Sequence, residues 1–104
     1  MDSIVKIMKA VFISFYKAFY SEIIEVLDQK GIRGFTFWEE VQGRGTTDGE
    51  PHYGTHAWPT LNSAIITFIP EEKVDDLLEL LRQLDASAPQ QGLRAFVLPV
   101  DKMM

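Results

Sequence analysis

The sequence predicts an α+β fold in which two amphipathic helices cover one face of a four-stranded antiparallel sheet. Apolar residues recur with helical spacing in two segments, and four short apolar or alternating segments surround them. The resulting order is strand, helix, strand, strand, helix, strand. A chain of 104 residues is expected to build one core, so we assign 1–104 to a single domain.

The first half of the chain begins with a strand and a helix. Residues 4–14 are rich in β-branched and apolar types, interrupted by two lysines, which is typical of a strand with one well-covered face. From Tyr16 to Lys30, apolar residues recur every three or four positions, which predicts an amphipathic helix. Its apolar positions are Phe19, Tyr20, Ile23, Ile24 and Leu27. Gly31 follows the last turn, where glycine commonly ends a helix.

Two strands follow this helix. In residues 32–43 apolar and polar residues alternate until the register slips at Glu40, which predicts a strand with a bulge near the acidic pair Glu39–Glu40. Residues 61–70 are a compact apolar run that ends at a proline, and they form the third predicted strand.

A second helix and a last strand complete the order. Pro70 and the two glutamates after it suit a first helical turn, because proline is tolerated there and carboxylates offset the positive end of the helix dipole. The apolar positions that follow are Val74, Leu77, Leu78, Leu81 and Leu84. Residues 85–92 are predicted to be a polar loop, 93–100 the fourth strand and 101–104 a tail.

This order is that of a ferredoxin-like βαββαβ fold. Phe35, Phe37 and Ile66 cannot all point at the helices, so the other face of the sheet is expected to carry apolar residues too. An apolar face of this kind needs a partner, and a second copy of the chain is the simplest one.

Composition excludes several classes of function. Ten Lys and Arg against fifteen Asp and Glu give a net charge of -5, so we expect no nucleic-acid interface. The chain has no cysteine, which excludes disulfides, thiolate nucleophiles and thiolate metal sites. The N-terminal segment lacks the pattern of a signal peptide, and no apolar run approaches the roughly 18 residues of a spanning helix. We therefore expect a cytoplasmic protein without direct membrane insertion.

Three segments resemble, in order and spacing, the PII signal-transduction proteins: 31-GIRGFTFWEEVQGRG-45, 70-PEEKVDDLLELL-81 and 94-RAFVLPVD-101. The resemblance spans almost the whole chain. It implies a non-enzymatic homotrimer that binds an adenine nucleotide, often with a small co-effector, in clefts between subunits. It also implies that the loop after the second strand, here about 44–60, signals to a transporter or another protein target.

The sequence departs from the typical pattern of this family, which points to a divergent PII-like member. The loop is shorter than the usual T-loop, and Tyr53 does not stand in the motif that is modified in nitrogen-sensing members. Of the glycine-rich turn before the last strand only Gly92 remains, and the chain ends at Met104 without the basic residues that typically follow. Nitrogen signalling by the standard route is therefore not expected, and PII-like relatives associated with metal-efflux or other transporters are the closer comparison.

The predicted effector site consists of glycines and arginines that flank the loop. Gly43 and Gly45 permit a turn whose backbone N–H groups face an anion, and Arg44 and Arg94 can fork onto phosphate or carboxylate. With Gly92 these residues are assigned to effector binding, converging across a subunit boundary. The alternative is that the glycines only end a strand and that each arginine is a solvated surface residue.

The loop itself supports two further assignments. His52 and His56, with Glu50 nearby, are a candidate ligand set for a divalent metal, although in a loop they can equally bond the loop to itself or to a neighbour. The residues assigned to contact a protein target are Thr46, Thr47, Asp48, Tyr53 and Trp58. Trp58 is expected to dock the end of the loop onto the protein, and Trp38 to pack within its strand.

No residue pattern supports an enzyme. Glu39 and Glu40 are consecutive strand residues, which face opposite sides, so they are expected to be solvated or salt-bridged and not to form one site. No serine or threonine stands in a nucleophile motif. No cofactor is required. The leading hypothesis is a PII-like regulator with an adenine-nucleotide effector; the alternatives are a metal-responsive protein on the same trimer and an oligomeric domain without a ligand.

Overall fold

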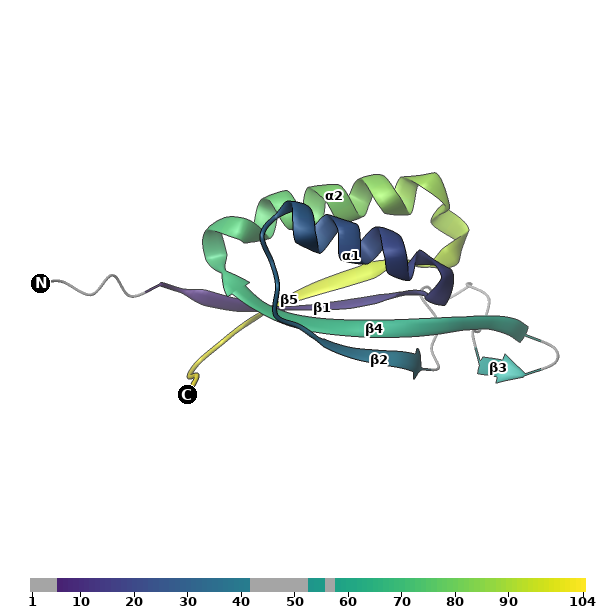
Figure 1. Cartoon of the computed structure of the whole chain (residues 1–104), viewed down its shortest axis with the longest axis horizontal. Helices are drawn as coiled ribbons and strands as arrows, with labels where there is room; N and C mark the ends of the chain where they lie inside the picture. The colour runs from purple at the N-terminus through teal and green to yellow at the C-terminus, as the bar shows by residue number, and fades with distance from the viewer. Residues whose placement is uncertain (1–5, 42–52, 56–57) are drawn as a thin grey trace, which may run out of the picture.

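The structure, a computed structural model, describes residues 6–41, 53–55 and 58–104, and for 53–55 and 58–61 only the backbone. Four strands form an antiparallel sheet in the order β2-β4-β1-β5. Their bounds are β1 Met8–Tyr16, β2 Thr36–Val41, β4 Trp58–Pro70 and β5 Arg94–Pro99. The helices α1 (Tyr20–Gln29) and α2 (Val74–Ser87) lie side by side on one face of this sheet (Figure 1). The ferredoxin-like βαββαβ fold is confirmed.

Both helices begin later than their sequence patterns predict. Tyr16 still pairs with Asn62 as the last residue of β1, and the 3-10 helix η1 (Lys17–Phe19) turns the chain before α1. Pro70 likewise pairs with Met8, and η2 (Glu71–Lys73) precedes α2. Strand pairing therefore overrides the helical periodicity at these two junctions.

The connection after β2 contains a short strand that the sequence pattern does not predict. Strand β3 (Tyr53–Thr55) pairs antiparallel with the first residues of β4, which itself starts at Trp58 and not at residue 61. Part of the predicted 44–60 loop is thus a hairpin that extends from one end of the sheet (Figure 1).

The core lies between the helices and the face of the sheet that they cover, called the inner face. Fully buried residues alternate along β1 and β4 and recur at helical spacing in α1 and α2. The largest of them are Phe15, Ile13, Ile23, Leu27, Ile65 and Leu77. Phe37 of β2 packs against this core, and its ring centroid lies 4.7 Å from that of Tyr20.

Gly31 ends α1 as predicted. Its φ of 69° is left-handed, its N–H donates to the Asp28 carbonyl at 3.0 Å, and the Ile32 N–H donates to the Leu27 carbonyl at 2.9 Å. These two bonds are those of a Schellman motif, and Ile32 is buried beside it. This C-terminal cap ends α1 and turns the chain back toward β2.

The opposite face of the sheet, called the outer face, carries large apolar side chains that remain exposed. Register pairs place Phe12 opposite both Ile66 and Phe96, and Ala10 opposite both Phe68 and Leu98, so these residues share one face. Phe68, Phe96 and Leu98 are 47%, 56% and 47% exposed. The expectation that the sheet is apolar on both faces is confirmed.

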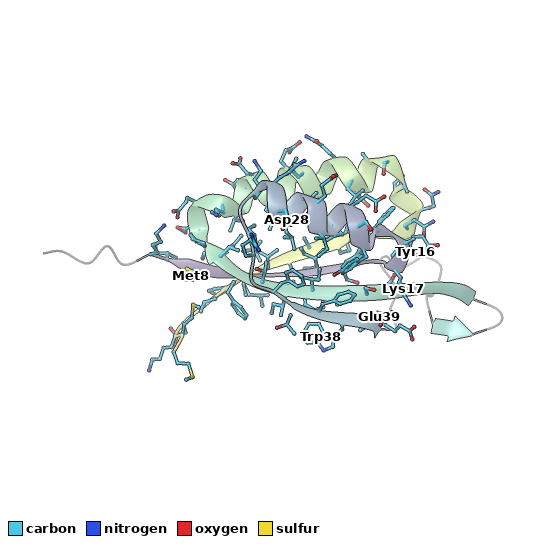
Figure 2. All side chains as sticks on the ribbon, viewed as in Figure 1. Met8, Tyr16, Lys17, Asp28, Trp38 and Glu39 are labelled. Atoms are coloured by element: carbon cyan, nitrogen blue, oxygen red, sulfur yellow. The ribbon has the colours of Figure 1, made fainter. Side chains whose placement is uncertain are left out.

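Trp38 belongs to the outer face as well. Its ring lies 6.5 Å from that of Phe12 and points away from the helices (Figure 2). It is 45% exposed, so it packs within the chain only in part. Among the described residues, no helix is long and apolar enough to cross a membrane.

Candidate functional site

Of the predicted effector residues, Gly92 and Arg94 are described, and they lie at the end of the sheet where β2 also ends. Strand β1 ends there at Tyr16 and β2 ends there at Val41, and both residues pair with Asn62 of β4. Arg94 starts β5 at the same end, opposite Ser14. The end of β2 and the turn into β5 therefore lie at the same end of the molecule, on the right in Figure 1.

Within one chain, the end of β2 and the turn into β5 belong to opposite edges of the sheet. Strands β2 and β5 are separated by β4 and β1, which amounts to three inter-strand steps, or about 14 Å. A small anion cannot touch both edges of one copy at once. Contact with both edges requires either a long ligand or a second copy that places its β2 edge beside this β5 edge.

The turn before β5 depends on Gly92. This glycine caps the 3-10 helix η3 (Pro89–Gln91) with φ 74° and ψ 35°, and its N–H donates to the Pro89 carbonyl at 3.3 Å. Residues with a β-carbon are strained in this left-handed conformation. Part of the predicted 85–92 loop is therefore regular structure, since α2 continues to Ser87 and η3 follows it.

Arg94 presents its side chain on the outer face. It pairs with Ser14, whose strand neighbours Ile13 and Phe15 are buried on the inner face, so alternation places Ser14 and Arg94 on the other side. The guanidinium donates one hydrogen bond to the Leu93 carbonyl at 2.7 Å, and the side chain is half-buried. A guanidinium has five N–H donors, so it can hold this bond and still fork onto an anion.

The bulge predicted in β2 is present and has a defined partner. The register between β2 and β4 shifts between Trp38 and Val41, and the buried Ser63 hydroxyl donates to the Glu39 carbonyl inside the shifted segment. Further along β4, the buried Thr67 hydroxyl donates to the Gly34 carbonyl at 2.6 Å, just before β2 begins. Two hydroxyls of β4 thus hold β2 at positions where the backbone ladder is irregular or has not yet started.

The bulge also brings Glu39 and Glu40 to the same side chain. Lys17 Nζ lies 3.4 Å from Glu39 Oε2 and 3.0 Å from Glu40 Oε2. The expectation that strand alternation keeps these two carboxylates apart is therefore wrong. The register shift cancels the alternation at this point. The expected salt-bridged role is confirmed, and the hydrogen bond to Glu40 raises the pKa of Lys17 above its ordinary value. Figure 2 shows Lys17 and Glu39 beside each other at this end.

Most of the residues predicted for the loop lie outside the described residues. These are Gly43, Arg44, Gly45, Thr46, Thr47, Asp48, Glu50, His52 and His56. The backbones of Tyr53 and Trp58 are described, and they lie in β3 and at the start of β4. In residues 6–41, 53–55 and 58–104 no group of three or more His, Cys, Asp or Glu side chains could hold a metal ion. The metal assignment stays a prediction.

Two residues at this end were missed by the sequence reasoning. Lys17 and Ser63 fix the bulge at the base of the loop, although neither belongs to a motif. The break of alternation at Glu40 was the available signal, since a bulge leaves a backbone carbonyl that needs a donor.

A family comparison and a search of solved structures both give matches. The family described as nitrogen regulatory protein P-II matches residues 8–104. No curated protein matches the sequence.

Several solved structures share the fold. The structure of CPII bound to ADP and bicarbonate, from Thiomonas intermedia K12, has a TM-score of 0.73 and 25% identity and covers 89% of this chain and 85% of that one. CPII bound to ADP, AMP and bicarbonate gives 0.74, with 23% identity and the same coverage. A putative PII-like signalling protein from Thermus thermophilus gives 0.62, with 22% identity, covering 89% and 86% of the two chains.

Proposed function

The chain belongs to the nitrogen regulatory protein P-II family, and on this premise we propose that it is a non-enzymatic, cytoplasmic regulator that binds an adenine nucleotide between the copies of a homotrimer. Gly43, Arg44 and Gly45 of one copy and Gly92 and Arg94 of its neighbour form the effector site in this proposal. The segment 44–60 then carries the signal to a protein target such as a membrane transporter.

The observation that carries the proposal is the position of the end of β2 relative to the turn into β5. Strand β2, which Gly43, Arg44 and Gly45 follow in the sequence, ends at the same end of the sheet where β5 starts at Arg94, but the two strands are opposite edges. A ring of copies repeats the same heterologous contact, in which the β2 edge of one copy meets the β5 edge of the next. Each contact then assembles one complete site, which a lone copy lacks.

The exposed outer face supports association of the copies. Phe68, Phe96, Leu98 and Trp38 form a continuous apolar surface across β2, β4, β1 and β5, because Ile66, Phe12 and Ala10 lie between them. A surface of this kind is normally covered by a partner.

The choice of effector rests on the relatives and on charge. CPII was solved with ADP, AMP and bicarbonate, all of them anions. A chain with a net charge of -5 needs local donors to hold an anion, and Arg94 and the glycine turns supply them at the site. ADP with bicarbonate is therefore the first effector pair to test.

The proposal is tested by calorimetric titration of the full chain with ADP, AMP and ATP, with and without bicarbonate. Saturable binding of at least one nucleotide is expected. Arg94→Gln should weaken it about tenfold or more, since a hydrogen bond to a charged group is lost. Arg33→Gln is the matched control, because exposed Arg33 precedes β2 at the other end of the sheet. No heat and no melting shift with any nucleotide would remove the effector assignment.

A further inference from the structure

A small pocket lies between α2 and β5, on the helix side of β5 and next to the turn that carries Gly92. Its volume is about 150 Å³, and it is lined by Leu78, Leu81, Arg82, Asp85, Leu93 and Ala95. Leu93 is buried and Ala95 packs against the core, so both face the helices, whereas Arg94 between them faces the outer side. The pocket and the proposed effector site are thus on opposite sides of β5.

The pocket has an apolar wall and a charged wall. Leu78 and Leu81 of α2, Leu93 just before β5 and Ala95 of β5 make the apolar wall, and Arg82 and Asp85 of α2 make the charged one. Residues three apart on a helix lie on one face, with their β-carbons about 5–6 Å apart. The guanidinium of Arg82 and the carboxylate of Asp85 therefore lie side by side next to the apolar wall of the pocket.

The position of the Asp85 carboxylate is unfavourable for the stability of α2. It lies in the last turn of α2, where the helix dipole disfavours a carboxylate and where no basic residue offsets it. Its Oδ1 atom is buried and accepts no hydrogen bond from any described residue. Buried oxygens are normally paired, so this carboxylate is short of a donor.

Arg82 does not supply that donor. Its Nη1 lies 3.5 Å from Glu79 Oε1, on the preceding turn of the helix, and this exposed pair is weakly held. The guanidinium can turn from Glu79 toward a ligand carboxylate at little cost. One carboxylate that lacks a donor and one weakly paired guanidinium therefore line the pocket.

The geometry points to a free α-amino acid with a small aliphatic side chain as the ligand of this pocket. The ammonium group binds Asp85, the carboxylate binds the Arg82 fork, and the side chain fills the space against Leu78, Leu81 and Leu93. The adjacent charges of the zwitterion match the adjacent charges of the helix face, with charge-assisted bonds of about 2.8 Å on both sides.

The size of the pocket limits the side chain. The pocket volume of about 150 Å³ is that of a cavity that holds benzene. A branched side chain such as that of valine fits this space, tryptophan exceeds it and glycine leaves it empty. Valine is therefore the probe of choice.

The test is a titration of the full-length protein with L-valine, without nucleotide, followed by calorimetry and by amide chemical shifts of α2 and β5. Saturable binding with a Kd of about 1 mM or tighter is expected. Isobutylamine lacks the carboxylate, 3-methylbutanoate lacks the ammonium and glycine lacks the side chain, so each should bind at least tenfold more weakly. Because nucleotide is absent, this result does not depend on the effector proposal.

Two charge-removing variants and a control locate the site. Asp85→Asn and Arg82→Gln should each weaken valine binding about tenfold or more, while Asp75→Asn should leave it intact because Asp75, an exposed residue in the first turn of α2, does not line the pocket. Thermal unfolding of the same samples checks that Asp85→Asn stays folded. The inference is overturned if valine does not saturate by about 10 mM, if Asp85→Asn binds it like the parent, or if isobutylamine binds as well as valine.

Discussion

The two faces of the sheet use the same kinds of residue in opposite ways. Phe15 on the inner face is fully buried against the helices, whereas Phe96 on the outer face is 56% exposed. Both are aromatic strand residues, and β1 and β5 are hydrogen-bonded neighbours. The inner face is complete within one chain, while the outer face is apolar but uncovered. The fold thus supplies stability on one side and an assembly surface on the other.

The largest expected effect separates these two phenylalanines. Phe15→Ala should lower the free energy of unfolding by about 3–5 kcal/mol, because a fully buried ring leaves a cavity. That loss should be the same at every protein concentration. Phe96→Ala should cost less in dilute protein, and its cost should grow with concentration if the outer face binds another copy. Urea unfolding at several protein concentrations checks both. Equal, concentration-independent losses would contradict the contrast.

A charge on the outer face should break the assembly. Phe96→Glu places a carboxylate on the apolar surface, where burial against a neighbour is costly, so the mass in solution should fall from trimer to monomer. Glu25→Lys changes the charge on the exposed side of α1, far from that face, and should leave the mass unchanged. Light scattering after size exclusion measures both. A parent protein that is already monomeric at tens of micromolar would contradict the role assigned to the outer face.

Two glycines next to β2 and β5 should respond differently to alanine. Gly92 has φ 74°, so Gly92→Ala should cost about 1–2 kcal/mol of stability. Gly34 has no atom within 4 Å of an added β-carbon and no positive φ, so Gly34→Ala should be neutral or stabilising by up to about 1 kcal/mol. Thermal or urea unfolding compares them. Similar losses at both positions would mean that the turn before β5 does not require a glycine.

The smallest expected effect concerns the exposed cluster at the base of the loop. The hydrogen bond to Glu40 raises the pKa of Lys17 above 10.5, so the cluster stabilises the fold below that pH. The stabilisation should fade as the pH rises through the raised folded pKa. Lys17→Gln should therefore melt below the parent at about pH 8, and the difference should shrink as the pH rises through the raised pKa of Lys17 and in high salt. A difference independent of pH would show that Lys17 acts by packing and not by charge.

The element order could be predicted from the sequence because each element carries a local signal. The helical spacing of Ile23 and Leu27, the glycine that ends α1, and the slip of alternation at Glu40 all correspond to observed features. Each signal depends on residues a few positions apart, so it can be read without knowing the fold.

The parts that were not predicted depend on pairing between distant segments. The helix starts were displaced because Tyr16 and Pro70 remain in strands that pair across the sheet. Strand β3 exists through its pairing with β4, and Glu39 and Glu40 meet at Lys17 only because Ser63 holds the bulge. At the site, Arg94 is placed as the first residue of β5 and Gly92 by the turn before it, while the loop residues stay predictions.

The most direct test of the account mixes two defective proteins. Arg44→Ala and Arg94→Ala should each lose nucleotide binding alone. If each site takes Arg44 from one copy and Arg94 from the next, random reassembly of an equal mixture into rings should restore about a quarter of the sites. Calorimetry of the reassembled mixture with ADP measures that fraction. Recovery near one quarter is the predicted result, and no recovery despite subunit exchange would contradict a site shared between copies.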